Sequence, residues 1–145
     1  MNKKIIFTAL FFILVSVFVN AQSNTQLAHR HFRLSLEQLI EGDYQNAVQS
    51  SSTAIRLNPN SPLLYLVRAR AFFELDDFEK AIPDCTQVIR LDRNNSSAYE
   101  IRGNAHKKTG DIEKAVSDWE AALRLNPNLE EVRTNIELTR LVSEN

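Results

Sequence analysis

The chain has 145 residues, of which 43% are hydrophobic and 24% are charged, and its formal net charge is −1. This near balance argues against a nucleic-acid-binding protein, which usually carries an excess or a stripe of basic residues. The length is sufficient for one hydrophobic core. Cys85 is the only cysteine, so the chain has no internal disulfide, and we expect Cys85 to be a small buried apolar residue.

The first residues, "MNKKIIFTALFFILVSVFVNAQ", have three parts. Two lysines precede an apolar run at residues 5–19, and small residues follow up to Ala21. This order is typical of a secretory signal peptide, and it resembles bacterial export signals. The run is shorter than the roughly 20 residues of a membrane span. We therefore predict a signal peptide at 1–21, cleavage after Ala21, no membrane span afterwards, and a periplasmic or secreted protein. An inner-membrane anchor formed by an uncleaved 5–19 is the alternative.

One phrase occurs three times at a constant spacing: "AIRLNPN" starts at residue 54, "VIRLDRN" at 88 and "ALRLNPN" at 122. Each copy follows the previous one by 34 residues. Other positions keep the same period, and they are Ala47, Ala81 and Ala115 together with Asp43, Asp77 and Asp111. A 34-residue period of this kind resembles the tetratricopeptide repeat (TPR) family, whose unit is a helix–turn–helix.

The resemblance implies an all-α, right-handed α-solenoid of three helix–turn–helix TPR units with a C-terminal capping helix. We predict a short flexible start at 22–27, followed by units at 28–61, 62–95 and 96–129, and a cap and tail at 130–145. Terminal repeats commonly need such a cap, because the last apolar face is otherwise open to water. The apolar residues of the cap, from Leu129 to Leu141, are spaced as on one face of a helix.

Local signals place the helices of each unit. Pro62 suits the first position of the first helix in the second unit. The tripeptides "GDY", "DDF" and "GDI" form the turn, in which glycine adopts a left-handed conformation and the aspartate caps the next helix. Trp119 is expected to pack in the core. Pro83 falls inside a predicted helix, where we expect a bend or a shifted helix start.

The sequence contains no recognisable catalytic, cofactor or metal-binding motif. His29 and His31 are two residues apart, so they point away from each other on a helix. His106 has no partner at zinc-ligand spacing, and no glycine-rich phosphate loop or nucleophile elbow occurs. We therefore predict a protein that is not an enzyme and that binds neither cofactor nor metal.

The TPR resemblance implies a concave groove that binds a peptide or protein segment. In one version of the family, two lysines, two asparagines and an arginine hold a partner's terminal carboxylate. The corresponding residues here are Phe32, Leu36, Val67, Ser97 and Ile101, none of which matches, so we predict no carboxylate-clamp chaperone partner. The predicted groove residues are Phe32, Leu36, Leu66, Val67, Arg70, Phe73, Ile101, Asn104 and Lys107.

These inferences combine into one functional prediction. The protein is expected to be a non-catalytic adaptor or scaffold in the bacterial envelope, with an apolar or amphipathic segment of another protein in its groove. Two alternatives stay open. The protein could be a self-associating structural spacer and therefore a homo-oligomer, or an accessory subunit of an envelope enzyme complex. The apolar residues among the predicted groove set could also pack between helices instead of lining a groove.

Overall fold

The computed structural model describes residues 3–143 and confirms the prediction of an all-α solenoid. In this part of the chain 84% of the residues are helical and no strand occurs. Seven helices follow one another, and they are α1 (Lys3–Ile40), α2 (Tyr44–Leu57), α3 (Pro62–Glu74), α4 (Phe78–Leu91), α5 (Ser96–Lys108), α6 (Ile112–Leu125) and α7 (Glu130–Ser143).

The turns within the helix pairs α1–α2, α3–α4 and α5–α6 share one backbone geometry. Gly42, Asp76 and Gly110 precede the capping aspartates, and their φ angles are 79°, 57° and 87°. Glycine adopts this left-handed conformation without steric cost, whereas Asp76 pays a small penalty. The carboxylates of Asp43 and Asp111 accept hydrogen bonds from backbone N–H groups of α2 and α6, as predicted. The carboxylate of Asp77 makes no such bond.

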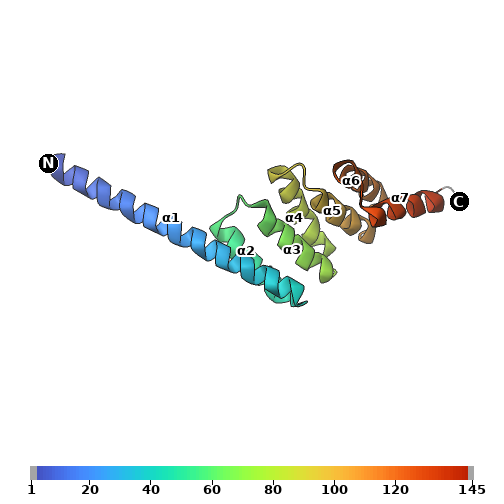
Figure 1. The fold of residues 1–145 in the computed structure, drawn as a ribbon, viewed down its shortest axis with the longest axis horizontal. Helices are drawn as coiled ribbons and strands as arrows, with labels where there is room; N and C mark the ends of the chain where they lie inside the picture. Colours follow the sequence, from blue (N-terminus) through green and yellow to red (C-terminus); the bar gives the residue numbers. More distant parts are fainter. Residues whose placement is uncertain (1–2, 144–145) are drawn as a thin grey trace.

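The helices stack in order along one axis, with α7 against the last pair (Figure 1). Alanines fill the narrowest contacts between helices, because the absence of a longer side chain lets two backbones approach closely. The fully buried alanines are Ala47, Ala54, Ala69, Ala81, Ala98, Ala105, Ala115 and Ala122, together with Ala71. The cap closes the stack as predicted, since Val132 and Ile136 of α7 form a buried cluster with Trp119.

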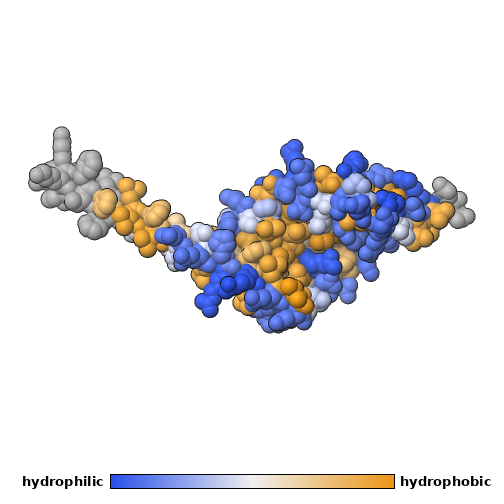
Figure 2. Space-filling view, in the orientation of Figure 1, coloured by the Kyte–Doolittle hydropathy of each residue, from blue (hydrophilic) through white to orange (hydrophobic). Residues whose placement is uncertain are grey.

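The first helix is longer than the sequence pattern predicted. Residues 22–27, expected to be a short flexible start, continue α1, because no glycine or proline interrupts the chain between Lys3 and Ile40. From residue 13 to residue 19 the side chains of α1 are exposed, and they include Phe18 and Val19. Figure 2 shows this apolar arm projecting from the body of the molecule. Within the described residues, no helix reaches the length and apolarity that a membrane crossing requires.

Pro83 lies inside α4 without displacing the start of that helix. α2, α4 and α6 begin at Tyr44, Phe78 and Ile112, a constant interval of 34, so the expected shift does not occur. The ring of Pro83 is exposed, but its nitrogen cannot donate a hydrogen bond to the carbonyl of Glu79 one turn earlier.

We expect Pro83→Ala to stabilise the protein by about 1–2 kcal/mol. Proline inside a helix costs about 3 kcal/mol, and part of that cost is recovered because proline restricts the unfolded chain by about 1 kcal/mol. Urea denaturation followed by circular dichroism measures the difference. A variant less stable than the parent chain would show that α4 needs the proline for its packing.

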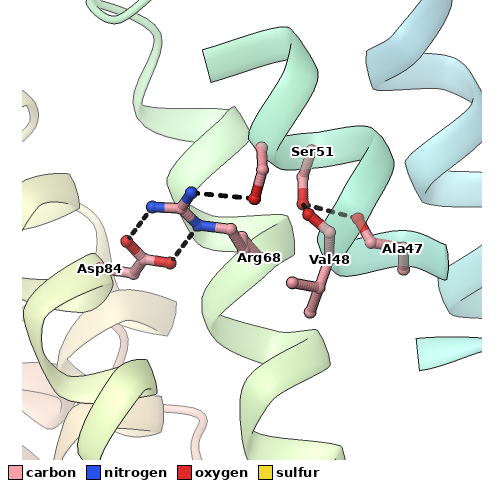
Figure 3. A network of polar contacts seen from close by, with 6 residues as sticks. Ala47, Val48, Ser51, Arg68 and Asp84 are labelled. Carbon is pink, nitrogen blue, oxygen red and sulfur yellow. Dashed lines mark hydrogen bonds and ion pairs between the residues drawn. The ribbon is translucent and has the colours of Figure 1, made fainter. Parts of the chain in front are cut away.

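Two arginines each join three consecutive helices. Arg68 of α3 donates from Nε and Nη2 to the two carboxylate oxygens of Asp84 on α4, both at 2.7 Å, and from Nη1 to the hydroxyl of Ser52 on α2 at 3.0 Å (Figure 3). Arg102 of α5 repeats the pattern 34 residues later with Asp118 on α6 and Thr86 on α4, at 2.7–3.1 Å.

Both carboxylates of these ion pairs are buried, because Asp84 and Asp118 are each only 6% exposed. The hydrogen bonds from the aspartates raise the pKa of Arg68 and of Arg102 above the usual value for arginine. Each arginine therefore connects its own helix pair and also ties that pair to the preceding one. We call the two sets, Ser52–Arg68–Asp84 and Thr86–Arg102–Asp118, the arginine ladder.

Cys85 is fully buried and free, as the sequence predicted. Burial raises the pKa of its thiol to about 12, and the neighbouring Asp84 adds to the increase. The unfolded chain therefore loses this proton at a lower pH than the folded one. Burial of the thiol consequently lowers stability as the pH rises from about 9 towards about 12.

We expect the folded protein to resist alkylation by iodoacetamide at pH 8.5, because only the thiolate reacts and this thiol is both protonated and inaccessible. Mass spectrometry after a fixed labelling time measures the modified fraction. The same protein in urea is the control and should be fully modified. Rapid labelling of the folded chain would contradict the buried position.

Candidate functional site

A groove runs between α3, α5 and α7 on one side of the stack. Its volume is about 580 Å³, and it is open to solvent. The lining side chains are polar or charged apart from one aromatic ring, and they are Arg70, Phe73, Glu100, Asn104, Lys107, Lys108, Glu131 and Asn135. We call this site the polar groove. It has the size of a typical ligand or peptide pocket.

Trp119 orders the floor of the polar groove from below. The indole is fully buried, and its Nε1 donates a hydrogen bond to Oδ1 of Asn104 at 2.8 Å. The ammonium group of Lys107 lies 5.6 Å from the centre of the indole ring and donates to Oδ1 of Asn135 on α7 at 3.3 Å. Gly103 makes this arrangement possible, because a Cβ atom there would lie 2.6 Å from Cδ1 of Trp119.

A second, apolar pocket adjoins the polar groove. Its volume is about 360 Å³, and its lining consists of Lys107, Ile112, Leu138, Thr139 and Val142. Lys107 borders both sites, so the two form one continuous surface. Leu138 is 54% exposed and Val142 is 79% exposed, although both belong to the predicted cap helix. We call this second site the apolar pocket.

The structure brings together four of the nine predicted groove residues, which are Arg70, Phe73, Asn104 and Lys107. Two others lie in the interior, because Val67 is 7% exposed and Ile101 is 5% exposed. Leu66 is half-buried and packs with Ile101 around Ala69 and Cys85. Phe32 packs against the buried cluster of Ala54, Ile55 and Leu64, and Leu36 is half-buried on α1. Much of the predicted apolar strip therefore packs between helices.

The polar groove also contains four residues that the sequence reasoning missed, Glu100, Lys108, Glu131 and Asn135. A signal for two of them was present. α7 begins 34 residues after α5, so counting one further period from Ser97 and Ile101 gives Glu131 and Asn135. The sequence analysis treated α7 only as a cap and did not extend the repeat into it.

The described side chains offer no cluster suited to acid–base or metal chemistry. No group of three or more His, Cys, Asp or Glu residues in this part of the chain converges so as to hold a metal ion. Burial lowers the pKa of His106, the histidine nearest the groove helices, which favours its neutral form. The arrangement of an open groove beside an apolar pocket is suited to holding an extended or helical polypeptide segment.

Stacked antiparallel helix pairs with an open groove along one side define a helical-repeat protein. A tetratricopeptide repeat model matches residues 96–129, and a second tetratricopeptide repeat model matches residues 32–98. The chain belongs to the tetratricopeptide repeat family, and this membership identifies it as a protein–protein interaction module. No curated protein sequence matches the chain.

Several solved structures are similar to this chain. The second TPR of Spaghetti (RPAP3) bound to the HSP90 peptide SRMEEVD is 33% identical, with a TM-score of 0.70 over 74% of this chain and 99% of that one. The first TPR of the same protein, with the same peptide, is 27% identical, with a TM-score of 0.79 over 83% and 96%. The Arabidopsis OM64 TPR domain is 28% identical, with a TM-score of 0.78 over 81% and 97%.

Proposed function

We propose that this protein is a non-catalytic adaptor that holds a segment of another protein along the polar groove and the apolar pocket. The observation that carries the proposal is the continuity of the two sites through Lys107. Polar side chains on three helices supply hydrogen bonds, while the exposed Leu138 and Val142 supply an apolar contact. An amphipathic segment satisfies both surfaces at once.

A site-specific crosslinker tests the proposal in the native host. A photoreactive residue at Leu138 should capture one defined protein partner, and Leu138→Asp should abolish co-purification of that partner. Leu34→Asp is the matched control, because Leu34 is a leucine of α1 that is 40% exposed and lines neither site. Equal loss of the partner in both variants, or in neither, would contradict docking at the apolar pocket.

We further propose that the partner is not held by a carboxylate clamp. The HSP90 peptide SRMEEVD is bound in two of the similar structures. The five clamp positions in this chain hold Phe32, Leu36, Val67, Ser97 and Ile101, and none of these side chains carries a charge. Fluorescence titration with SRMEEVD should show no saturable binding. Micromolar affinity for this peptide would contradict the proposal.

For the location, we propose export directed by residues 1–21, with cleavage after Ala21 and release into the periplasm or medium. The exposed apolar side chains of α1 from residue 13 to residue 19 support a segment that is either removed or placed in lipid. N-terminal sequencing of the native protein should begin at Gln22. A chain in the membrane fraction that retains residues 5–19 would instead support the anchored form.

Self-association is the second candidate function, and the exposed Leu138, Leu141 and Val142 favour it. In a structural spacer this apolar surface would bind a second copy of the chain. Light scattering at micromolar concentration separates the two candidates. A monomer supports the adaptor, whereas a dimer that Leu138→Asp dissociates supports the spacer.

A further inference from the structure

The basic side chains of the polar groove already have partners within the protein. Nε of Arg70 lies 2.7 Å from a carboxylate oxygen of Glu74. Lys107 donates to Asn135 and lies over the Trp119 ring, and the ammonium group of Lys108 lies 5.9 Å from the centre of the Phe78 ring. A docking segment therefore does not need to supply an acid to keep these cations satisfied.

The two carboxylates of the polar groove are different. Glu100 of α5 and Glu131 of α7 both line the groove, and neither accepts a hydrogen bond or forms an ion pair with any residue that the structure describes. Burial raises the pKa of Glu100, Arg70 opposes that rise, and the negative charge of Glu131 adds to it. The two carboxylates therefore repel each other across the groove, and Glu100 is already partly removed from water.

A segment that covers the polar groove removes more water from both carboxylates. A carboxylate that loses water without gaining a donor or a cation pays a desolvation penalty of several kcal/mol. An acidic segment would add a further like charge. A guanidinium or ammonium group placed between Glu100 and Glu131 instead replaces the lost water and cancels the repulsion, and arginine can donate to two carboxylates at once.

We propose that the occupant is a partner segment in which a basic side chain lies between Glu100 and Glu131 and an apolar side chain follows it into the apolar pocket. This inference rests on the proposed adaptor function and specifies the chemistry of the partner. The charge preference is opposite to that of a groove built for acidic peptides, and the carboxylates that set it come from adjacent helices of the stack.

Three synthetic peptides test the inference with the full chain in mild detergent. They differ only in one central residue, arginine, glutamine or glutamate, and each continues with two leucines. Trp119 is the only tryptophan of the chain, and its hydrogen bond to Asn104 on the groove floor makes its fluorescence a direct readout of occupancy. Anisotropy of labelled peptides gives an independent affinity. Thermal melts of all variants confirm that they are folded.

The arginine peptide should bind at least about tenfold more tightly than the glutamate peptide. The double variant Glu100→Gln, Glu131→Gln should remove most of that preference and leave the affinity for the glutamine peptide unchanged. Glu113→Gln is the matched control, since Glu113 is an exposed glutamate of α6 outside both sites, and it should change nothing.

The outcomes separate the inference from the proposed function. If the glutamate peptide binds as tightly as the arginine peptide, or if the double variant keeps the full preference, the charge assignment is wrong while groove docking stands. If no peptide binds, or if Leu138→Asp leaves the affinity for every peptide unchanged, docking at this surface is wrong and the inference falls with it.

Discussion

Replacing Asp118 with alanine is expected to lower the free energy of unfolding by about 3 kcal/mol, because the substitution leaves the guanidinium of Arg102 without its carboxylate in a largely buried site. Asp118 is only 6% exposed and accepts two hydrogen bonds from Arg102, at 2.8 and 2.7 Å. The hydroxyl of Thr86 and the ring of Tyr99 are the contacts that Arg102 retains, and neither carries a charge. Urea denaturation followed by circular dichroism measures the loss.

A double substitution distinguishes the loss of the pair from the cost of an unpaired charge. Arg102→Met with Asp118→Leu removes both charges and keeps the volume, so its stability should lie close to that of the parent chain. Asp84→Ala in the other rung of the arginine ladder should behave as Asp118→Ala does, since Arg68 loses the same two hydrogen bonds. A loss of less than about 1 kcal/mol in either single variant would show that these pairs behave as exposed ones.

The second large effect is expected at Gly103, where alanine should destabilise the protein by about 2–3 kcal/mol through overpacking. In an exposed helix the same change would stabilise by about 1 kcal/mol, because alanine is the better helix former. At Gly103 the new methyl group would lie 2.6 Å from Cδ1 and 2.8 Å from Nε1 of Trp119. The indole cannot move aside freely, because it is fully buried and bonded to Asn104.

The preceding helix pair supplies the control for Gly103. There Ala69 occupies the position equivalent to Gly103, and Cys85 occupies the position equivalent to Trp119, so a larger residue on one helix faces a smaller one on the other. Gly103→Ala combined with Trp119→Cys recreates this pair. The double variant should lose less stability than the sum of the two single changes. Strict additivity would contradict direct contact between the two positions.

The 34-residue period was sufficient to predict most of the fold. Asp43, Asp77 and Asp111 mark the starts of α2, α4 and α6, and Pro62 marks the start of α3. These signals are local, because capping and turn conformation depend on neighbouring residues in the chain. The same local logic did not predict the length of α1, since the expected flexible start at 22–27 lacks any helix breaker.

The groove was harder to predict, because burial depends on which helix covers a side chain. The repeat identifies Val67 and Ile101 as equivalent positions, but it does not show that neighbouring helices bury both of them. Glu100 has no sequence signature of its own, and it becomes notable only when α7 brings Glu131 near it. The arginine ladder was within reach, because Arg68 and Arg102, like Asp84 and Asp118, keep the 34-residue interval.

The arginine ladder also ranks the helix pairs by how easily each one opens. Leu34 and Ser50 stand in α1 and α2 where the later pairs have arginine and aspartate, so the described part of the chain shows no ion pair between these two helices. Local opening free energies follow such differences in buried polar and apolar contacts. Amide hydrogen exchange should therefore be faster in α2 than in α4 and α6. The stack would then fray from its N-terminal pair while the helices around the polar groove stay folded.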